Sequence, residues 1–291
     1  MPSFDSIVEF FTPWDVSPTV LISCVALFIF YIRGMVINRR LGETTGFWHA
    51  TAFLLAILSI YFFMQTRLDY WSQHMFWIHR LQHLVLHHVA PMLIALSAPV
   101  IVLRHGTPAW LLEHVVRPVW NFPLTRFSYR VLQNPVVAAV LFAGLIAFWL
   151  EPSIHFKAML SVERYKLMNW SMLLDGVLFW WLIVGPPKQS SLKPVPYGAR
   201  LVMLFLIVIP QNIIGARIAL SHDILFDVYN VCGRAWPIDP LTDQEIGGLI
   251  TWIPSSMMSV IGVLIVLYRW MKQSEADYQA SISKPATENA S

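Results

Sequence analysis

The sequence predicts an all-α fold, a polytopic bundle of about seven transmembrane helices, and three observations support this prediction. Hydrophobic residues make up 56% of the 291 residues and charged residues only 13%, whereas a soluble domain carries about 25% charged residues. The apolar residues also gather in blocks close to the length needed to cross a bilayer. Because lipid offers the backbone no hydrogen-bond partners, these blocks are expected to be helices.

The apolar blocks divide the chain into three parts. Residues 1–17 form an N-terminal segment, residues 18–271 form the seven-helix membrane domain, and residues 272–291 form a polar tail that is typical of disorder. The spans are predicted near 18–37, 47–64, 75–103, 135–150, 168–185, 199–221 and 248–270. Pro91 and Pro99 are expected to kink the third span.

Basic residues alternate between the loops along the chain. The loops after the first, third, fifth and seventh spans are rich in Lys and Arg, whereas the opposite loops are poorer in them. The positive-inside rule therefore predicts that the N-terminus lies outside and the C-terminus in the cytoplasm. The basic residues behind the net charge of +3 lie in loops beside apolar segments, so the composition indicates the lipid bilayer as a partner and no nucleic acid.

The stretch HRLQHLVLHH, residues 79–88, places four histidines within ten residues. On a helix His79, His83 and His87 share one face, because they follow one another at i, i+4 and i+8. The predicted orientation puts this face in the outer half of the membrane, with His74 at its mouth. Two imidazoles at i and i+4 are well placed to bind one metal ion with further ligands from elsewhere. Hydrogen bonding between helices is the structural alternative, but three histidines in a stripe favour handling of a metal ion or a proton.

Other polar and thioether side chains are predicted to converge on the same half of the membrane. Asp175 lies about two turns into the fifth span, where a carboxylate needs a cation or a water-filled cavity. Arg80 and Arg217 are its candidate partners. Thioethers suit Cu(I), although methionine is also a common gap-filler in apolar packing. The further candidates at the outer ends of the spans are Met75, Met168, Asn169 and His222.

Three classes of protein were compared with this pattern. The first is a metal-handling or assembly protein with an outward-facing, histidine-lined site. The second binds b-type haem, which usually needs histidines on two facing helices, whereas here the deep histidines lie on one span and His49, His155 and His222 are expected near surfaces. The third, a membrane di-iron oxygenase, is excluded because such enzymes need more histidines in several boxes. The residues thus indicate a histidine-lined site without fixing its metal.

Several motifs resemble those of a known family. HRLQHLVLHHVAPMLIALSAP resembles HMxQHLLLxxxAPxLLxLGxP, the signature of the CtaG family of polytopic assembly factors for caa-type cytochrome c oxidases; His79, Gln82 and His83 fall on matching positions. GVLFWW at 176–181 is similar to the family's GLLFWW, and DPLTDQEIGGLITWIP at 239–254 is similar to DPLxDQxxGGLxMWxP. The resemblance extends from just before the histidines to the end of the seventh span.

The sequence also departs from the family pattern. Leu150 stands where the family's WHxP corner has its histidine, and Tyr165, Met168 and Asn169 stand where LHxLEH has two histidines and a glutamate. We therefore expect a divergent member in which a metal site is either lost or rebuilt. His87, at a position where relatives have an apolar residue, is a candidate for rebuilding it, as is Met168.

The resemblance implies a role in maturing the oxidase in a prokaryotic cell (inner) membrane, with the copper-bearing subunit as partner. Copper would be held or passed by His79 and His83. Four residues at the outer mouth of the seventh span are implied either to cap that helix, where carboxylates favour the dipole, or to receive a partner: Asp239, Asp243, Gln244 and Glu245. No catalytic nucleophile, phosphate loop or acid–base pair is apparent, so no enzyme is expected. The alternatives are a haem-binding or proton-conducting membrane protein and a metal-free assembly scaffold.

Overall fold

The computed structural model describes residues 10–186, 189 and 192–283. Within these ranges every regular element is helical, which confirms the all-α class. Among the described residues five helices are long and apolar enough to cross a membrane, and the number rises to seven if each of two bent helix pairs forms one span. The upper number agrees with the prediction of about seven spans.

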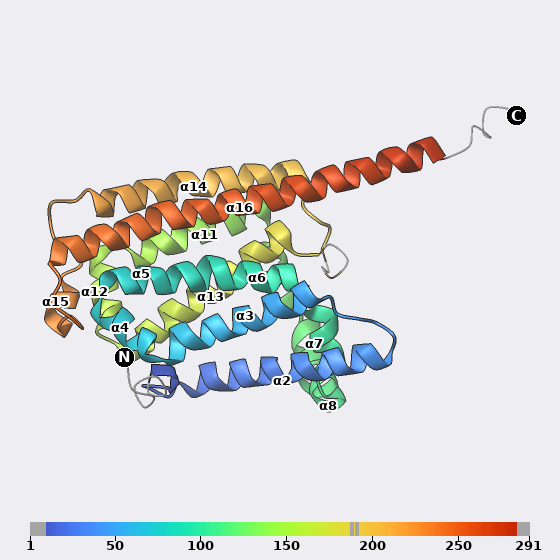
Figure 1. The fold of residues 1–291 in the computed structure, drawn as a ribbon, viewed down its shortest axis with the longest axis horizontal. Coiled ribbons are helices and arrows are strands. Elements are labelled where there is room, and N and C mark those ends of the chain that lie inside the picture. Colours follow the sequence, from blue (N-terminus) through green and yellow to red (C-terminus); the bar gives the residue numbers. More distant parts are fainter. Residues whose placement is uncertain (1–9, 187–188, 190–191, 284–291) are drawn as a thin grey trace, which may run out of the picture.

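The helices form an elongated bundle with two distinct ends (Figure 1). Five spans are single helices: α2 (Pro18–Arg40), α3 (Phe47–Gln65), α13 (Val162–Val184), α14 (Tyr197–Ala219) and α16 (Pro240–Ser283). The bent pairs comprise α5 (Phe76–Leu84), η1 (Val85–Val89), α6 (Ala90–Ser97) and α7 (Val100–Gly106), and then α10 (Pro123–Leu132) with α11 (Pro135–Trp149). One end carries α4 (Arg67–His74), α12 (Pro152–Met159) and α15 (Val228–Cys232), and the other carries α7, α8 (Ala109–Leu111), η2 (Leu112–Val116) and α9 (Arg117–Asn121).

The third predicted span, 75–103, is interrupted near its end. The helix axis turns by 74° between Ser97 and Val100, where Ala98 adopts the left-handed conformation with φ of 50° and Pro99 follows. A left-handed residue before a proline ends an α-helix, so the kink predicted at Pro99 is confirmed. Pro91 lies in the first turn of α6, directly after the π-helical η1, and π-bulges are frequent at functional sites.

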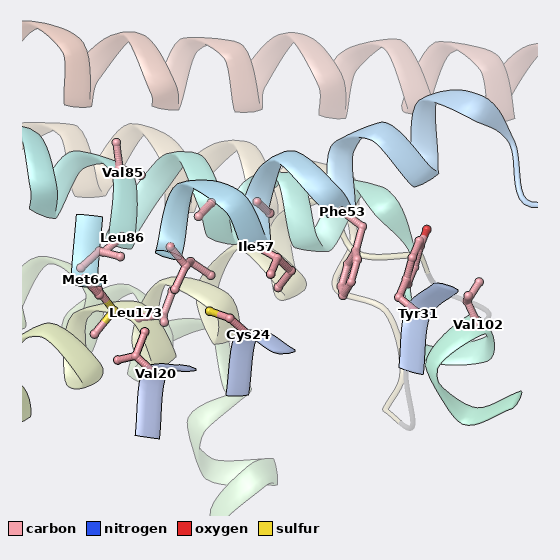
Figure 2. Packing of buried hydrophobic residues seen from close by; sticks show 13 residues of the cluster. Val20, Cys24, Tyr31, Phe53, Ile57, Met64, Val85, Leu86, Val102 and Leu173 are labelled. Carbon is pink, nitrogen blue, oxygen red and sulfur yellow. The ribbon is translucent and has the colours of Figure 1, made fainter. Parts of the chain in front are cut away.

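The bent α7 is locked against α2 by direct backbone contact. A Cβ atom added at Gly106 would lie 1.7 Å from the Phe30 carbonyl oxygen, and one at Gly34 would lie 1.9 Å from the carbonyl oxygen of Val102. Deeper in this layer Tyr31 stacks on Phe53 with ring centroids 4.0 Å apart. Figure 2 shows these rings within the apolar cluster that joins α2, α3 and α13.

The final helix, α16, continues beyond the membrane domain. Residues 272–283, which the sequence places in a disordered tail, are helical, and residues 272–282 are exposed. They extend a helix that is already formed, so they need no new nucleus, and Gln279 donates a hydrogen bond to Glu275 one turn earlier. Residues 284–291, the rest of that tail, and residues 1–9 of the N-terminal segment lie outside the described ranges.

Candidate functional site

The candidate site begins at the N-terminus of α5, which is capped by a side chain from α16. Met75 precedes α5 in an extended conformation and offers no side-chain cap. Asp243 instead accepts hydrogen bonds from the backbone N–H groups of Phe76 and Trp77, at 3.1 and 2.9 Å, and forms an ion pair with Arg234 at 3.3 Å. Asp243 is fully buried. This contact between helices fixes the first turn of α5 and therefore the position of the histidines that follow.

Three buried histidines come together directly below this cap. The ring centroid of His79 lies 4.4 Å from that of His83 and 5.1 Å from that of His155. His79 Nδ1 donates to the carbonyl oxygen of Ser72 at 3.3 Å, which fixes the tautomer and leaves a lone pair on Nε2. That Nε2 atom is buried and has no hydrogen-bond partner among the described residues. His79 therefore presents an imidazole nitrogen that is free to accept a ligand.

His155 is the residue that sequence reasoning missed, because it was expected near a surface. Its side chain is 1% exposed; Nδ1 donates to the Trp149 carbonyl oxygen and Nε2 accepts from the Tyr229 hydroxyl, both at 3.0 Å. Burial lowers the pKa of His155 to about 3 and raises the pKa of Tyr229 well above its usual value. His155 is therefore neutral and Tyr229 protonated. The chain turns back toward the bundle directly before Pro152, the first residue of α12. This proline is the feature of the sequence that could have indicated a buried His155.

His83 is tied into the bundle through both ring nitrogens. Its Nε2 donates to the side-chain oxygen of Asn169 at 3.1 Å, and its Nδ1 accepts from the Arg80 guanidinium at 3.3 Å. Arg80 also donates to the Thr251 hydroxyl at 2.9 Å and is 5% exposed. In the described part of the chain no carboxylate pairs with Arg80. The cluster therefore contains a buried positive charge beside His83.

A buried carboxylate, Asp69, organises the side of the cluster that faces α4. One oxygen accepts from the Tyr165 hydroxyl at 2.7 Å and from Gln82 at 3.0 Å, and the other accepts from Gln73 at 3.0 Å and Trp14 at 3.2 Å. Gln82, predicted as a supporting residue, thus donates a hydrogen bond to Asp69 and links α5 to α4. Tyr165 occupies a position where the family pattern has histidine, and here it acts as a hydrogen-bond donor.

Asp69 should make stability depend on pH. Burial raises its pKa to about 6 from 3.8, against the opposing effect of its hydrogen bonds. A carboxyl group with a raised pKa in the folded state binds more protons folded than unfolded, so its contribution to stability is lost as pH rises from 4 to above 6. We expect acidification from pH 7 to pH 4 to stabilise the protein by up to about 3 kcal/mol through this group.

The measurement is thermal unfolding in detergent across this pH range, for the native chain and for Asp69→Ala. The pH-dependent gain should be smaller in the variant by the contribution of Asp69. Identical pH profiles for the two proteins would show that Asp69 titrates normally.

A cavity of about 340 Å³ leads from the α4–α12–α15 end toward the histidines. Its wall includes Asp69, Tyr165 and Asn169, and Asn169 is the residue that binds His83. The thioethers of Met64 and Met159 also line it. The side chain of Asn169 therefore separates the cavity from His83.

A second polar cluster lies deeper in the bundle, at η1. His87 Nε2 lies 3.0 Å from a carboxylate oxygen of Asp175, so the partner of Asp175 is His87 and not Arg80 or Arg217. The approach is close because position 176 is glycine: a Cβ atom there would lie 2.5 Å from the His87 carbonyl oxygen. The Gln211 amide donates to His88 Nε2 at 3.2 Å.

The remaining predicted site residues fall into two groups. His74 is held by the Gly233 carbonyl at 2.7 Å, away from the cluster, and Arg217, His222 and Glu245 are exposed. Met75 and Met168 are fully buried, and Met168 packs in the apolar cluster that contains Tyr229.

Two motif residues of α16 have local structural roles. Asp239 accepts from the Thr242 backbone N–H at 3.0 Å and so caps α16 itself, which is one of the two roles expected for it. Gln244 accepts from Leu225 N–H at 2.7 Å and donates to the Asp223 carbonyl at 3.0 Å, which anchors the preceding loop.

The donor set fits a metal ion in part. No group of three His, Cys, Asp or Glu side chains within the described ranges is arranged to hold an ion. Two imidazoles, those of His79 and His155, each have Nδ1 held by a backbone carbonyl, so Nε2 is the ring atom that would face a metal ion. Imidazole is a suitable ligand for copper. Both ring nitrogens of His83 are hydrogen-bonded to side chains, whereas His79 has a buried nitrogen without a partner among the described residues and His155 has one that accepts from a hydroxyl.

Comparison with known proteins identifies the family. Residues 29–273 match the family described as "Cytochrome c oxidase caa3 assembly factor (Caa3_CtaG)". The chain belongs to this family. The Caa3_CtaG motifs acquire structural roles here: Asp243 of DPLTDQ caps α5, and the glycines of GVLFWW and DQEIGG allow close approach of α13 to η1 and of α16 to α14.

Curated relatives occur in mycobacteria. This Caa3_CtaG chain is 27% identical over 282 residues to an uncharacterised protein of Mycobacterium leprae, with 94% of this chain and 42% of the relative covered. Uncharacterised proteins of Mycobacterium bovis and Mycobacterium tuberculosis are each 22% identical over 289 residues with the same coverage. The chain thus spans about two fifths of the length of these relatives. No solved structure matches the chain.

Proposed function

We propose that this membrane protein assists assembly of a cytochrome c oxidase in a prokaryotic cell membrane, in a non-catalytic role. We further propose that its buried histidines hold or pass a copper ion for the outward-facing copper centre of the oxidase. One observation carries the second part: His79 Nε2 is buried without a partner while its Nδ1 is fixed by Ser72. Metal-binding histidines commonly have this arrangement.

The surroundings suit a soft, singly charged ion. Copper(I) would be bound by His79 and by His155, whose Nε2 would exchange the Tyr229 hydroxyl for the ion. The low pKa of His155 keeps that imidazole neutral at physiological pH, so no proton competes for its lone pair. The 340 Å³ cavity and its thioethers provide access from the α4–α12–α15 end, which the positive-inside rule places outside.

The exposed surface at this end fits the proposed partner, an oxidase subunit. Acidic side chains predominate around the mouth of the bundle, and a surface with one sign of charge steers a partner of opposite sign. The exposed acids at this end are Asp15, Glu151, Glu163, Asp223, Asp227, Asp239 and Glu245.

A metal-free assembly scaffold is the second candidate, and one observation favours it. The Arg80 guanidinium lies 3.3 Å from His83 Nδ1, and a buried positive charge opposes the binding of a second cation nearby. Under this alternative His79 and His155 only shape the core of the bundle.

The two candidates are separated by copper binding. The detergent-purified protein, incubated with Cu(I) and desalted, should retain about one copper per chain, as measured by elemental analysis together with a visible spectrum. The variant His79→Gln/His155→Gln should lose at least 90% of this copper, because both proposed donors are removed. His222→Gln, which changes an exposed histidine, is the matched control and should bind like the native chain.

Other results have equally direct meanings. Copper that is absent from the native protein, or equal in the double variant, would favour the scaffold. A Soret band would favour the haem-binding alternative. In cells, deletion of the gene should leave the oxidase subunits present but poor in copper, and normal copper content would contradict the copper-handling role.

A further inference from the structure

The segment that follows α7 lies on the surface of the bundle with its apolar side chains uncovered. None of the residues in α8, η2, α9 and α10 is buried. Trp110 is 63% exposed and Phe122 58% exposed. Aromatic side chains with such exposure are typical of the membrane–water interface. The segment therefore lies along one face of the bilayer, and α10, bent by 76° from α11, is the part of that pair that lies in this plane while α11 enters the membrane.

The helix α10 has two chemically different faces. Leu124, Phe127 and Val131 follow one another at helical spacing and are all exposed, so they form an apolar face for the acyl-chain region. Arg126 and Arg130 lie one turn apart on the other face. The helix is therefore oriented with its arginines at the level of the lipid headgroups.

These arginines line a cavity. Trp120, Arg126, Tyr129, Arg130 and Leu192 line an open pocket of about 290 Å³, and the rings of Trp120 and Tyr129 meet edge to face with centroids 5.1 Å apart. Neither arginine forms an ion pair with any residue in the described part of the chain. Two guanidinium groups without a carboxylate, beside two interfacial aromatic rings, form a site for an anion with several oxygen atoms.

The position of the cavity identifies the anion. It is lined by residues of α9, α10 and the segment before α14, which follow α7 and α8 or lie beside them. The exposed basic side chains of these segments and of the last turn of α2, which packs on α7, are Arg39, Arg40, Arg104, Arg117, Arg126, Arg130 and Lys193. The positive-inside rule assigns this end of the bundle to the cytoplasm, whose leaflet carries anionic lipids, and basic pockets at this level bind phospholipid headgroups. Arginine forks match phosphate oxygens in a bidentate manner.

We propose that the cavity between Trp120, Arg126 and Arg130 binds the phosphate headgroup of an anionic phospholipid of the inner leaflet. The apolar face of α10 packs along the acyl chains of the same lipid. This site lies at the opposite end of the bundle from the histidines, so it does not depend on the proposed copper function.

The test uses the full chain in detergent micelles, titrated with phosphatidylglycerol or phosphatidylcholine and followed by native mass spectrometry. The native protein should bind phosphatidylglycerol in preference to phosphatidylcholine. Arg126→Gln/Arg130→Gln should weaken phosphatidylglycerol binding about tenfold or more, since both basic groups that would contact the anionic headgroup are removed. The matched control is Arg39→Gln/Arg40→Gln, which removes two exposed charges at the same end but outside the cavity.

Competition with inorganic phosphate and size exclusion of each variant are the two controls for this test. Equal loss in both double variants, no loss in either, or no preference for phosphatidylglycerol would overturn the proposal. Inorganic phosphate at millimolar concentration should leave the bound lipid in place, and displacement by it would assign the cavity to a soluble phosphate instead. The elution volume of each variant on size exclusion shows that the bundle is intact.

Discussion

Asp243→Ala is expected to lower the free energy of unfolding by about 3–5 kcal/mol, because it removes one partner of a buried ion pair and leaves the other uncompensated. The substitution removes the acceptor of two backbone N–H groups at the start of α5 and the counter-charge of Arg234. Unpaired buried donors cost free energy as well. Thermal unfolding in detergent should show a large fall in the midpoint, and copper retention should fall with it because His79 lies on the next turn of α5.

Asp239→Ala is the matched control for this prediction. Asp239 lies in the same motif but is exposed and caps only its own helix, so its loss should cost about 1 kcal/mol. Asp243→Asn keeps one acceptor oxygen and should fall between the two. Equal effects of Asp239→Ala and Asp243→Ala would show that the link between α16 and α5 does not stabilise the bundle.

Gly176→Leu is expected to cost on the order of 4 kcal/mol, because the new side chain has no space between α13 and η1. Its Cβ atom would lie 2.5 Å from the His87 carbonyl oxygen and 2.8 Å from Cγ of Pro91. These contacts involve backbone and a rigid ring, so the helices must separate. Separation would break the contact between His87 and Asp175, and the melting midpoint reports the loss.

A second pair of variants isolates this steric effect from helix propensity. Gly176→Ala and Gly144→Ala make the same change in two membrane helices, but a Cβ atom at Gly144 meets no other atom within 4 Å. Alanine is favoured over glycine in a helix by about 1 kcal/mol, so Gly144→Ala should be neutral or stabilising. Gly176→Ala should be destabilising, and a gain in stability at both positions would contradict the close-packing argument.

The all-α class and the spans were predictable because they depend on composition and on the length of apolar blocks. The contact between His79 and His83 was also predictable, since helical periodicity puts residues i and i+4 on one face, whereas His87 lies in the π-helical η1 and contacts Asp175 in the second cluster. These features depend on residues that are close together in the sequence, so they can be predicted from short sequence patterns.

The partners of the stripe were not predictable from local patterns. His155 reaches His79 only because α12 turns back under the bundle, and Asp69 becomes the centre of a hydrogen-bond network through residues from four separate segments. The pairing of Asp175 with His87 depends on the absence of a side chain at Gly176. Each of these contacts arises from packing between helices that are distant in the sequence.

The length of α16 has a mechanical consequence for the whole bundle. Its 44 residues span about 66 Å, roughly twice the hydrocarbon thickness of about 30 Å. The carboxylate that holds α5 and the turns that project from the opposite end are therefore parts of one rod (Figure 1). Tyr278 and Asp243 lie on the same continuous helix, so a displacement of the helix near Tyr278 is transmitted to Asp243 through helical backbone alone. Pro254 removes one backbone hydrogen bond from this rod, and that is where the rod bends most easily.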